Sequence, residues 1–355
     1  MFKLTMLDRY IGKQVLLSIL FTGLVLVGLR TLFTLLDEAG RIGQGDYGFA
    51  EALYYSLLLI PSRVYEFFPM AVLIGGLSAL GVMAGQNELT VMRAAGIKTM
   101  VIIGSAIKAT VVLMVFVFVL GEWVNPVTSV KAKQVKHQSL NGGILTETKA
   151  GYWAKSGQDV VHIRSLADNR LNQVTLFRLN PELQLNEVIS AEKAIYINQQ
   201  WHMDNARIET ITPDRVTTKQ ADFVWQSELQ PEQVEALSTE PEMLGIVGLI
   251  EYTSYLKENQ LDARSFDLAF WRKLAQPFTL VVMVILASSF IFGPMRSVSM
   301  GARLMMGIVV GFGFHILNNF FGPVSLVYNF PPLLGAITPV VLFATISAYL
   351  LKRAS

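Results

Sequence analysis

Three ionisable residues lie within or beside long apolar stretches of the chain, where a charge is costly unless it has a partner or a function. Arg30 lies late in the first apolar stretch, and Arg63 and Glu66 lie early in the second, within PSRVYEFFPM. In one interpretation Arg30 extends to the membrane surface and Arg63 pairs with Glu66 one helical turn later. In the other, the arginines form a basic collar that binds a phosphorylated or carboxylated lipid headgroup.

The residues that follow Glu66 favour a lipid over a soluble anion as the ligand of such a collar. Phe67, Phe68 and Met70 offer apolar, adaptable contacts that suit acyl chains. A small soluble anion would not need these contacts. Beside the structural interpretation we therefore predict a lipid cavity that these side chains share with the two arginines and Glu66.

A second cluster of candidate residues lies in the apolar stretch RLMMGIVVGFGFHILNNFFGP, residues 303–323. Gly307 and Gly311 form a G-x-x-x-G pattern, which lets another helix, of this chain or of a partner, approach closely. Lipid-facing helices avoid clusters of polar groups, so the second half of this stretch is predicted to face inward or to contact a partner. Its candidate cavity residues are Phe314, His315, Asn318, Asn319, Phe320 and Phe321.

Sequence motifs for catalysis are absent. The chain has no cysteine and no G-x-x-x-x-G-K-[ST], H-E-x-x-H or G-x-S-x-G motif. Its histidines, which are His137, His162, His202 and His315, show no spacing typical of metal ligands. We therefore expect no metal site, no ATP bound by this chain and no enzymatic activity of its own.

The stretch QNELTVMRAAGIK, residues 86–98, is too polar to cross a bilayer and has helical spacing. Leu89, Met92 and Ala95 share one face, while Glu88 and Arg93 lie elsewhere around the turn. A helix lying on lipid would be richer in bulky apolar residues. We favour a docking element, spanning Glu88 to Gly96, for a separate nucleotide-hydrolysing subunit.

Six apolar stretches are long enough to span a membrane and must position these residues. The chain is 52% hydrophobic and has a mean hydropathy of +0.44, both above the usual range of soluble domains. Because Pro61 and Pro69 lie in the second stretch, we predict that it is broken or kinked. The predicted spans are 13–36, 54–84, 99–123, 267–293, 303–322 and 332–351.

Basic residues in the short flanks predict the orientation of the spans. They gather in the head, in the stretch 86–98, in the turn 293–303 and in the tail, namely at Lys3, Arg9, Lys13, Arg93, Lys98, Arg296, Arg303, Lys352 and Arg353. In a chain with six spans these four segments fall on the same side. Both termini are therefore expected in the cytoplasm. Lys108, within the third span, is expected to extend toward the membrane surface.

The polar insert between the third and fourth spans is then expected outside. It contains short runs rich in Val, Ile, Thr and aromatic residues, separated by turn sequences. The runs are GYWAK, QDVVHIRSL, NQVTLFRL, NEVIS, KAIYIN, NARIETIT and ADFVWQS. The fold class is thus a polytopic α-helical membrane protein with an all-β, jelly-roll-like domain between helices 3 and 4. Its domains are 1–125, 126–266 (ending in a short helix at LGIVGLIEYTSYLKE) and 267–355.

Several of these segments together resemble the lipopolysaccharide-export permeases of Gram-negative bacteria, the LptF/LptG family. They are LDRYIGK (7–13), NELTVMRAAGI (87–97), GEWVNP (121–126), SFIFGPMRSVSMGAR (289–303) and FGPVSLVYNFPP (321–332). The first, the third and the SFIFGP stretch look more like the LptG branch than the LptF branch. The resemblance covers all six spans and is vague in the β insert.

The resemblance implies an ABC exporter of the bacterial inner membrane. An LptF-type permease would pair with this chain above a homodimer of the LptB-type ATPase, which would bind ATP and magnesium. An LptC-type single-span protein would join the complex. Lipopolysaccharide would enter from the outer leaflet, and periplasmic jelly-rolls would pass it to an LptA-type bridge for outer-membrane biogenesis. No nucleic acid is implied.

The resemblance also implies roles for individual residues. The stretch 86–97 would be the coupling helix, with Glu88 as its acidic residue, and spans one and five would form lateral gates. Arg30, Arg41 and Arg63 stand near positions where family members carry basic residues that contact lipid A and core sugars. Here Asp37 and Glu38 also occupy that region, and Arg63 is offset by one position.

The sequence therefore predicts a non-catalytic permease subunit that extracts lipopolysaccharide with energy from a partner ATPase. Two alternatives remain at this stage. A lipoprotein-releasing permease also combines few spans with a large external domain, but such proteins usually have four spans. A membrane scaffold with a periplasmic binding domain would need neither a basic collar nor a docking helix.

Overall fold

The structure, a computed structural model, describes residues 6–141, 152–156, 159–167, 170–180, 184–212, 215–227, 229, 231, 234, 240–259, 261–293 and 298–354. The chain forms two compact units. The first comprises Met1–Gly40, Leu53–Ala132 and Arg264–Ser355, and the second comprises Arg41–Ala52 and Lys133–Ala263. Lys3, Arg296 and several of the predicted turns between strands lie outside the described residues.

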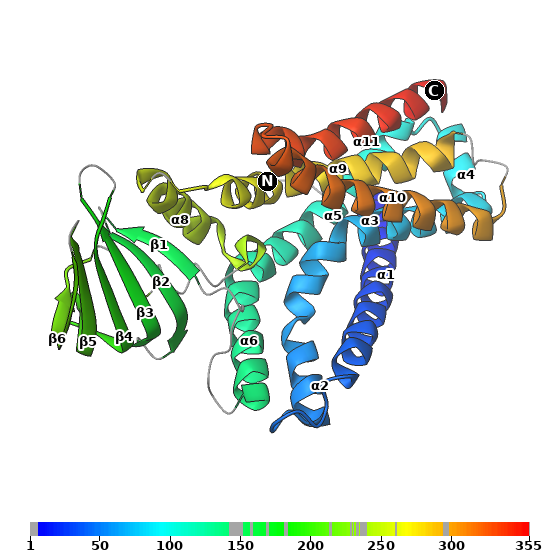
Figure 1. Cartoon of the computed structure of the whole chain (residues 1–355). Coiled ribbons are helices and arrows are strands. Elements are labelled where there is room, and N and C mark those ends of the chain that lie inside the picture. Colours follow the sequence, from blue (N-terminus) through cyan, green and yellow to red (C-terminus); the bar gives the residue numbers. More distant parts are fainter. Residues whose placement is uncertain are drawn as a thin grey trace. The chain divides into compact units, whose positions relative to one another are not determined.

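Long helices dominate the first unit (Figure 1). Six helices in the described part of the chain are long and apolar enough to cross a membrane, which confirms the prediction of a polytopic membrane protein. Five of them are continuous α-helices, and the third span joins several segments. The continuous helices are α1 (Met6–Ala39), α3 (Ile60–Gly85), α9 (Arg264–Phe292), α10 (Met300–Val327) and α11 (Pro332–Ala354).

The predicted break in the second span is confirmed. A separate helix, α2 (Phe49–Leu58), ends just before α3 begins, and Leu59 lies between them. Pro61 explains the position of the break, because it has no N–H to continue the hydrogen bonds of α2 yet is well accommodated in the first turn of α3. Pro69 lies inside α3, which continues past it to Gly85.

Helix α3 is the centre of the first unit. It packs against α1, α9 and α10, and Leu73, Leu77 and Leu80 on it are fully buried. The approach of α1 is so close that a Cβ atom on Gly75 would lie 2.6 Å from the Cα atom of Ile19. A glycine at this position is therefore required for the observed spacing of α1 and α3.

The third span contains a π-helical turn. It runs through α5 (Thr99–Val119), η1 (Leu120–Val124) and α6 (Asn125–Asn141), whereas the sequence suggested a polar insert from residue 126. In the π turn the N–H of Asn125 bonds to the carbonyl of Leu120. Since the hydrogen-bond pattern already changes here, Pro126 can follow without ending the helix.

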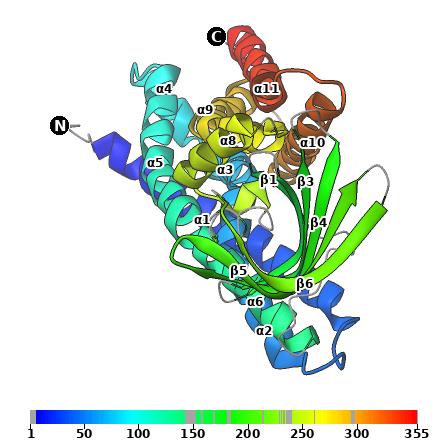
Figure 2. The same cartoon turned by 60° about the vertical axis from the view of Figure 1, so that its left-hand side comes forward.

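The second unit contains one antiparallel sheet whose strands are paired in chain order (Figure 2). Two predicted runs, NEVIS and KAIYIN, form one strand, because no turn residue separates them and the ladder stays in register along most of it. The sheet is consistent with the jelly-roll-like prediction. Its strands are β1 (Tyr152–Ser156), β2 (Asp159–Ala167), β3 (Arg170–Leu179), β4 (Leu185–Ile197), β5 (Gln200–Thr212) and β6 (Arg215–Trp225).

One face of this sheet carries a packed core. Trp201 and Trp225 are directly opposite each other in β5 and β6, and both are fully buried. The indole of Trp225 donates to Asp159 at 3.0 Å, and hydrogen bonding to Asp159 raises the pKa of Arg178. The short helix η2 (Pro241–Met243) and α8 (Ile246–Glu258) follow the sheet in the chain, and α8 confirms the helix predicted at 244–258.

Candidate functional site

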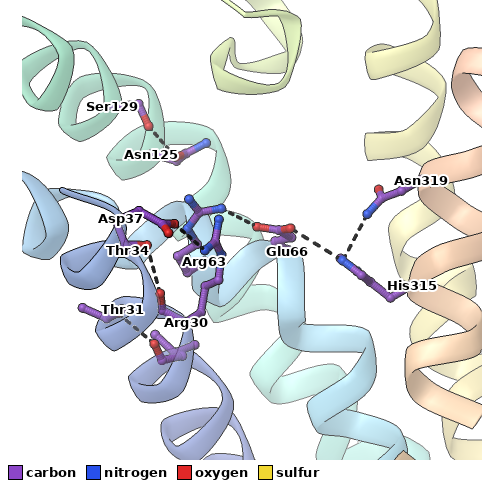
Figure 3. A network of polar contacts seen from close by, with 11 residues as sticks. Arg30, Thr31, Thr34, Asp37, Arg63, Glu66, Asn125, Ser129, His315 and Asn319 are labelled. Carbon is purple, nitrogen blue, oxygen red and sulfur yellow. Dashed lines mark hydrogen bonds and ion pairs between the residues drawn. The ribbon is translucent and has the colours of Figure 1, made fainter. Parts of the chain in front are cut away.

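The predicted pair of Arg63 and Glu66 is present in the first turns of α3. Arg63 Nη1 donates to Glu66 Oε2 at 2.8 Å, as the spacing of one helical turn predicts (Figure 3). Both side chains are partly buried. The Nε atom of Arg63 is buried and has no hydrogen-bond acceptor among the described residues. The arginine therefore keeps one donor that its internal pair does not use.

This pair continues into a chain of polar contacts between α3 and α10 (Figure 3). Glu66 Oε1 lies 3.9 Å from His315 Nε2, and Asn319 Nδ2 lies 3.1 Å from the same nitrogen. A neutral ring can accept the hydrogen bond from Asn319, whereas a protonated ring can pair with Glu66, but one nitrogen cannot do both. Phe67 stacks on the imidazole with 5.3 Å between ring centroids. The structure thus brings together five residues that the sequence placed in two separate clusters: Arg63, Glu66 and Phe67 of α3, and His315 and Asn319 of α10.

Arg30 lies on the neighbouring helix α1 and is only weakly paired. Its Nη1 atom is 3.9 Å from Asp37 Oδ2, and the Asp37 side chain is 73% exposed. An exposed pair at this distance contributes little to stability, so the guanidinium of Arg30 can exchange this contact for another anion. Arg41 is exposed and belongs to the second unit.

Three predicted cavity residues are instead part of the helix packing. Phe68, Met70 and Phe314 are buried, and Phe314 contacts Phe343 of α11 edge to face, with 5.2 Å between the centroids. Their positions on α3 and α10 face other helices, which the sequence alone does not reveal. These three side chains therefore contribute to helix packing in the observed conformation, and their contact with acyl chains stays a prediction.

The remaining predicted residues of α10 lie near its end. Phe320 is 60% exposed and packs edge to face on the partly buried Phe321. The backbone carbonyl of Asn318 accepts a hydrogen bond of 2.6 Å from Arg272 of α9. Polar and apolar side chains thus lie next to each other in this part of α10. Among the aromatic residues predicted to line the lipid cavity, Phe320 has the most accessible ring.

The G-x-x-x-G pattern serves packing within the chain. A Cβ atom on Gly307 would lie 2.6 Å from Leu77 Cδ1 of α3, and one on Gly311 would lie 3.7 Å from Leu73 Cδ2. The two glycines therefore let α10 approach α3. Of the two possibilities that the sequence left open, the contact with a helix of the same chain is the one observed.

The predicted docking helix is α4 (Glu88–Ala94). It ends in a Schellman motif, in which Gly96 has a φ of 87° and the N–H of Ile97 bonds to the carbonyl of Met92. Leu89 is buried and Met92 packs against the helical core, so this face is occupied within the chain. The surface that α4 offers to a partner is formed by Thr90, Val91, Arg93, Ala94, Ala95 and Gly96.

Two hydrogen-bonded contacts connect α1 to its neighbours at the end of the unit that carries α4. Tyr10 of α1 donates a hydrogen bond of 2.7 Å to Glu88 Oε1. Asp8, which is buried, accepts hydrogen bonds from Lys108 at 3.0 Å and from Ser105 at 2.7 Å, both on α5. Lys108 therefore does not simply extend to the surface as the sequence suggested, because a buried carboxylate lies within its reach.

A second buried ion pair lies at the π-helical turn. Lys273 of α9 donates to Glu122 at 2.6 Å, and their side chains are only 5% and 11% exposed. The ammonium group also lies 5.8 Å from the ring centroid of Tyr65, against which Gly121 packs. Sequence reasoning missed both pairs. The available signal was that charged residues inside apolar helices need partners.

No described group of three or more His, Cys, Asp and Glu side chains could hold a metal ion. The candidate lipid site combines cations and amides with nearby apolar surface, and the short helix α4 lies at the other end of α3. Figures 1 and 2 show α4 at the same end of the first unit as the C-terminus of α11.

These features define a class, that of multi-pass membrane proteins with a β domain inserted between helices. Comparisons with known proteins identify the family within this class. The family described as "Lipopolysaccharide export system permease LptF/LptG" matches residues 9–353. The chain belongs to this family, whose members are permease subunits.

Two relatives illustrate the similarity. The chain is 38% identical over 354 residues to the lipopolysaccharide export system permease protein LptG of Escherichia coli K12, with 98% of each chain covered. It is 37% identical over 351 residues to the LptG protein of Haemophilus influenzae, again with 98% of each covered. The chain is therefore similar to LptG proteins over nearly its whole length. This similarity does not favour the two alternatives, a lipoprotein-releasing permease and a membrane scaffold.

Proposed function

We propose that this chain is an LptG-type permease subunit of a lipopolysaccharide exporter in the bacterial inner membrane. The observation that carries the proposal is the similarity over 98% of both chains to proteins named for this role. The partners are those of the family resemblance: an LptF-type permease, an LptB-type ATPase homodimer, an LptC-type single-span protein and an LptA-type bridge. ATP and magnesium bind to the ATPase and not to this chain.

In this proposal α4 docks on the ATPase. Its exposed residues Arg93 and Ala95 contact the partner, while Leu89 and Met92 anchor the helix to the membrane helices. A short helix that is tied to α3 can transmit displacement of the ATPase, because α3 contacts α1, α9 and α10. Both termini and α4 then face the cytoplasm, while the insert at 126–266 faces the periplasm.

The lipid binds at the opposite end of α3. Arg30 and Arg63 contact phosphate or carboxylate groups of the lipid, and Phe67 and Phe320 contact its acyl chains. Arg41, which belongs to the second unit, stays a candidate for the same headgroup chemistry. Exposing an acyl chain to water costs about 0.8 kcal/mol for each CH₂ group, so release of a lipid with several chains needs an external energy source. ATP hydrolysis on the partner ATPase moves α1, α3 and α10, and this movement narrows the cavity between the two permeases and drives the lipid upward.

The test is reconstitution of the chain with its predicted partners in liposomes that contain lipopolysaccharide. We expect ATP-dependent release of lipopolysaccharide to a soluble acceptor, and no release without ATP or without this chain. A complex that assembles, hydrolyses ATP and extracts a lipoprotein instead of lipopolysaccharide would overturn the proposal.

A further inference from the structure

The segment LDRYIGK, residues 7–13, supports the family resemblance but has no part in the proposed cavity. In the structure it lies in the first turns of α1 and joins α1 to α4 and α5. Ile11 is fully buried, and a Cβ atom on Gly12 would lie 3.5 Å from the Cβ atom of Ala109. The segment therefore fixes how α1 sits at the end of the unit that carries α4.

The connection of this segment to α5 is strong. The carboxylate of Asp8 is buried and receives three hydrogen bonds: both of its oxygens accept from Lys108 Nζ, at 3.0 Å and 3.1 Å, and Oδ1 also accepts from Ser105. Separating these groups would remove a buried carboxylate from its cation, which is strongly unfavourable. Helices α1 and α5 are therefore expected to move together at this end.

The connection of the same segment to α4 is weaker. A single hydrogen bond of 2.7 Å joins the Tyr10 hydroxyl to Glu88 Oε1. The other oxygen, Glu88 Oε2, is buried, and no described residue donates a hydrogen bond to it. A buried carboxylate oxygen without a donor is unfavourable, so the observed position of α4 carries a cost. Movement of α4 that let water or another donor reach Oε2 would remove this cost.

Helix α4 is short and has a residue with positive φ at each end. Asn87 has a φ of 59° and Gly96 has a φ of 87°, so a left-handed residue bounds the helix on each side. Hinge movements are absorbed at such element-terminal residues while the helix between them stays rigid. Helix α4 can therefore turn as one body against α1.

We propose that the Tyr10–Glu88 hydrogen bond is a latch, which holds α4 against α1 in the resting protein and opens when the partner ATPase draws α4 away. This inference rests on the proposed function in one respect, because it takes α4 as the docking element. Tyr10 is then a positioning residue that acts through Glu88 and fixes where the docking helix stands before ATP hydrolysis.

The first test measures the position of α4 in the full chain and does not require transport. The chain has no cysteine, so cysteines introduced at the exposed residues Val91 of α4 and Val112 of α5 carry the only spin labels. We expect Tyr10→Phe to broaden the distribution of distances between the labels, measured by pulsed electron paramagnetic resonance. The matched control, Tyr349→Phe on the exposed side of α11, should leave the distribution unchanged. An identical distribution in Tyr10→Phe would overturn the latch.

The second test uses the complete exporter in liposomes and measures lipopolysaccharide released for each ATP hydrolysed. We expect this ratio to fall about fivefold in Tyr10→Phe, which corresponds to one hydrogen bond of about 1 kcal/mol, while the exporter still assembles. A broadened distance distribution with an unchanged ratio would overturn the role of the latch in coupling. Failure of the wild-type complex to release lipopolysaccharide would count against the proposed function and not against the latch.

Discussion

At the scale of single residues, the most informative contacts are between charged groups that lie far apart in the sequence. Asp8 pairs with Lys108, and Glu122 pairs with Lys273. The carboxylate of each pair is buried or nearly so, and there a lone charge would be costly whereas a matched pair is tolerated. Hydropathy identifies such residues as unusual, but it contains no information on which helix supplies the partner.

The Asp8–Lys108 pair gives a prediction for stability. We expect Lys108→Met to lower the free energy of unfolding by about 3 kcal/mol, because it leaves the buried Asp8 carboxylate without its cation. The double variant Asp8→Asn with Lys108→Met should recover most of this loss. The measurement is thermal unfolding in detergent, with Lys98→Met, an exposed lysine before α5, as the control. Equal melting temperatures of the single and double variants would contradict this account.

The arginines at the candidate lipid site give a prediction for binding. We expect Arg30→Glu combined with Arg63→Glu to reduce crosslinking of lipopolysaccharide to α1 and α3 about tenfold, more than either change alone, since hydrogen bonds to charged groups contribute about 1.5–3 kcal/mol. Lys13→Glu, at the other end of α1, is the control. Undiminished crosslinking in the double variant would show that neither arginine binds the lipid and that both have a purely structural role.

At the scale of elements, the glycines of α3 and α10 decide how closely helices approach. Gly75 faces the backbone of α1, and Gly307 faces Leu77 of α3. The sequence identified the second through its G-x-x-x-G pattern but gave no sign that Gly75 was equally constrained. The hydrophobic periodicity predicts which stretches are helices, and the contact between two helices depends on their relative rotation, which periodicity does not specify.

Gly75 therefore gives a prediction for packing. We expect Gly75→Ala to lower stability by about 1–3 kcal/mol, because the new Cβ atom would lie 2.6 Å from the Cα atom of Ile19 and α1 would have to move outward. Gly104→Ala on α5 is the matched control, since nothing lies within 4 Å of its Cβ position. Both are measured by thermal unfolding in detergent. A Gly75→Ala protein as stable as the wild type would show that α1 is loosely packed.

At the scale of the whole molecule, the sequence predicted much of the architecture and little of the site geometry. Six spans, the break near Pro61, the short helix at Glu88 and the β insert all follow from periodicity and local breakers. The length of α6 was missed because Pro126 reads as a helix end unless the π turn before it is known. The burial of Phe314 was missed because an aromatic residue in an apolar helix can face protein or lipid.

The orientation of the molecule is a prediction that cysteine labelling can test. We expect Val91→Cys on α4 to react with a membrane-impermeant maleimide only after the inner membrane is permeabilised, because α4 is predicted in the cytoplasm. Thr218→Cys on the exposed part of β6 should react in cells whose outer membrane alone is open. The chain has no cysteine of its own, so each signal has one source. The reverse pattern of labelling would invert the proposed topology.

The strand order of the second unit and the central position of α3 have opposite consequences for biosynthesis. Each strand pairs with the one made just before it, so the sheet can grow as the chain emerges from the ribosome. Helix α3, in contrast, is made early, and its neighbours Ala287 of α9 and Gly307 of α10 are made only after the whole insert. Until then the inner face of α3 lacks its final neighbours. While the insert is translated, the face of α3 that α9 and α10 later cover is therefore in contact with lipid or with another protein.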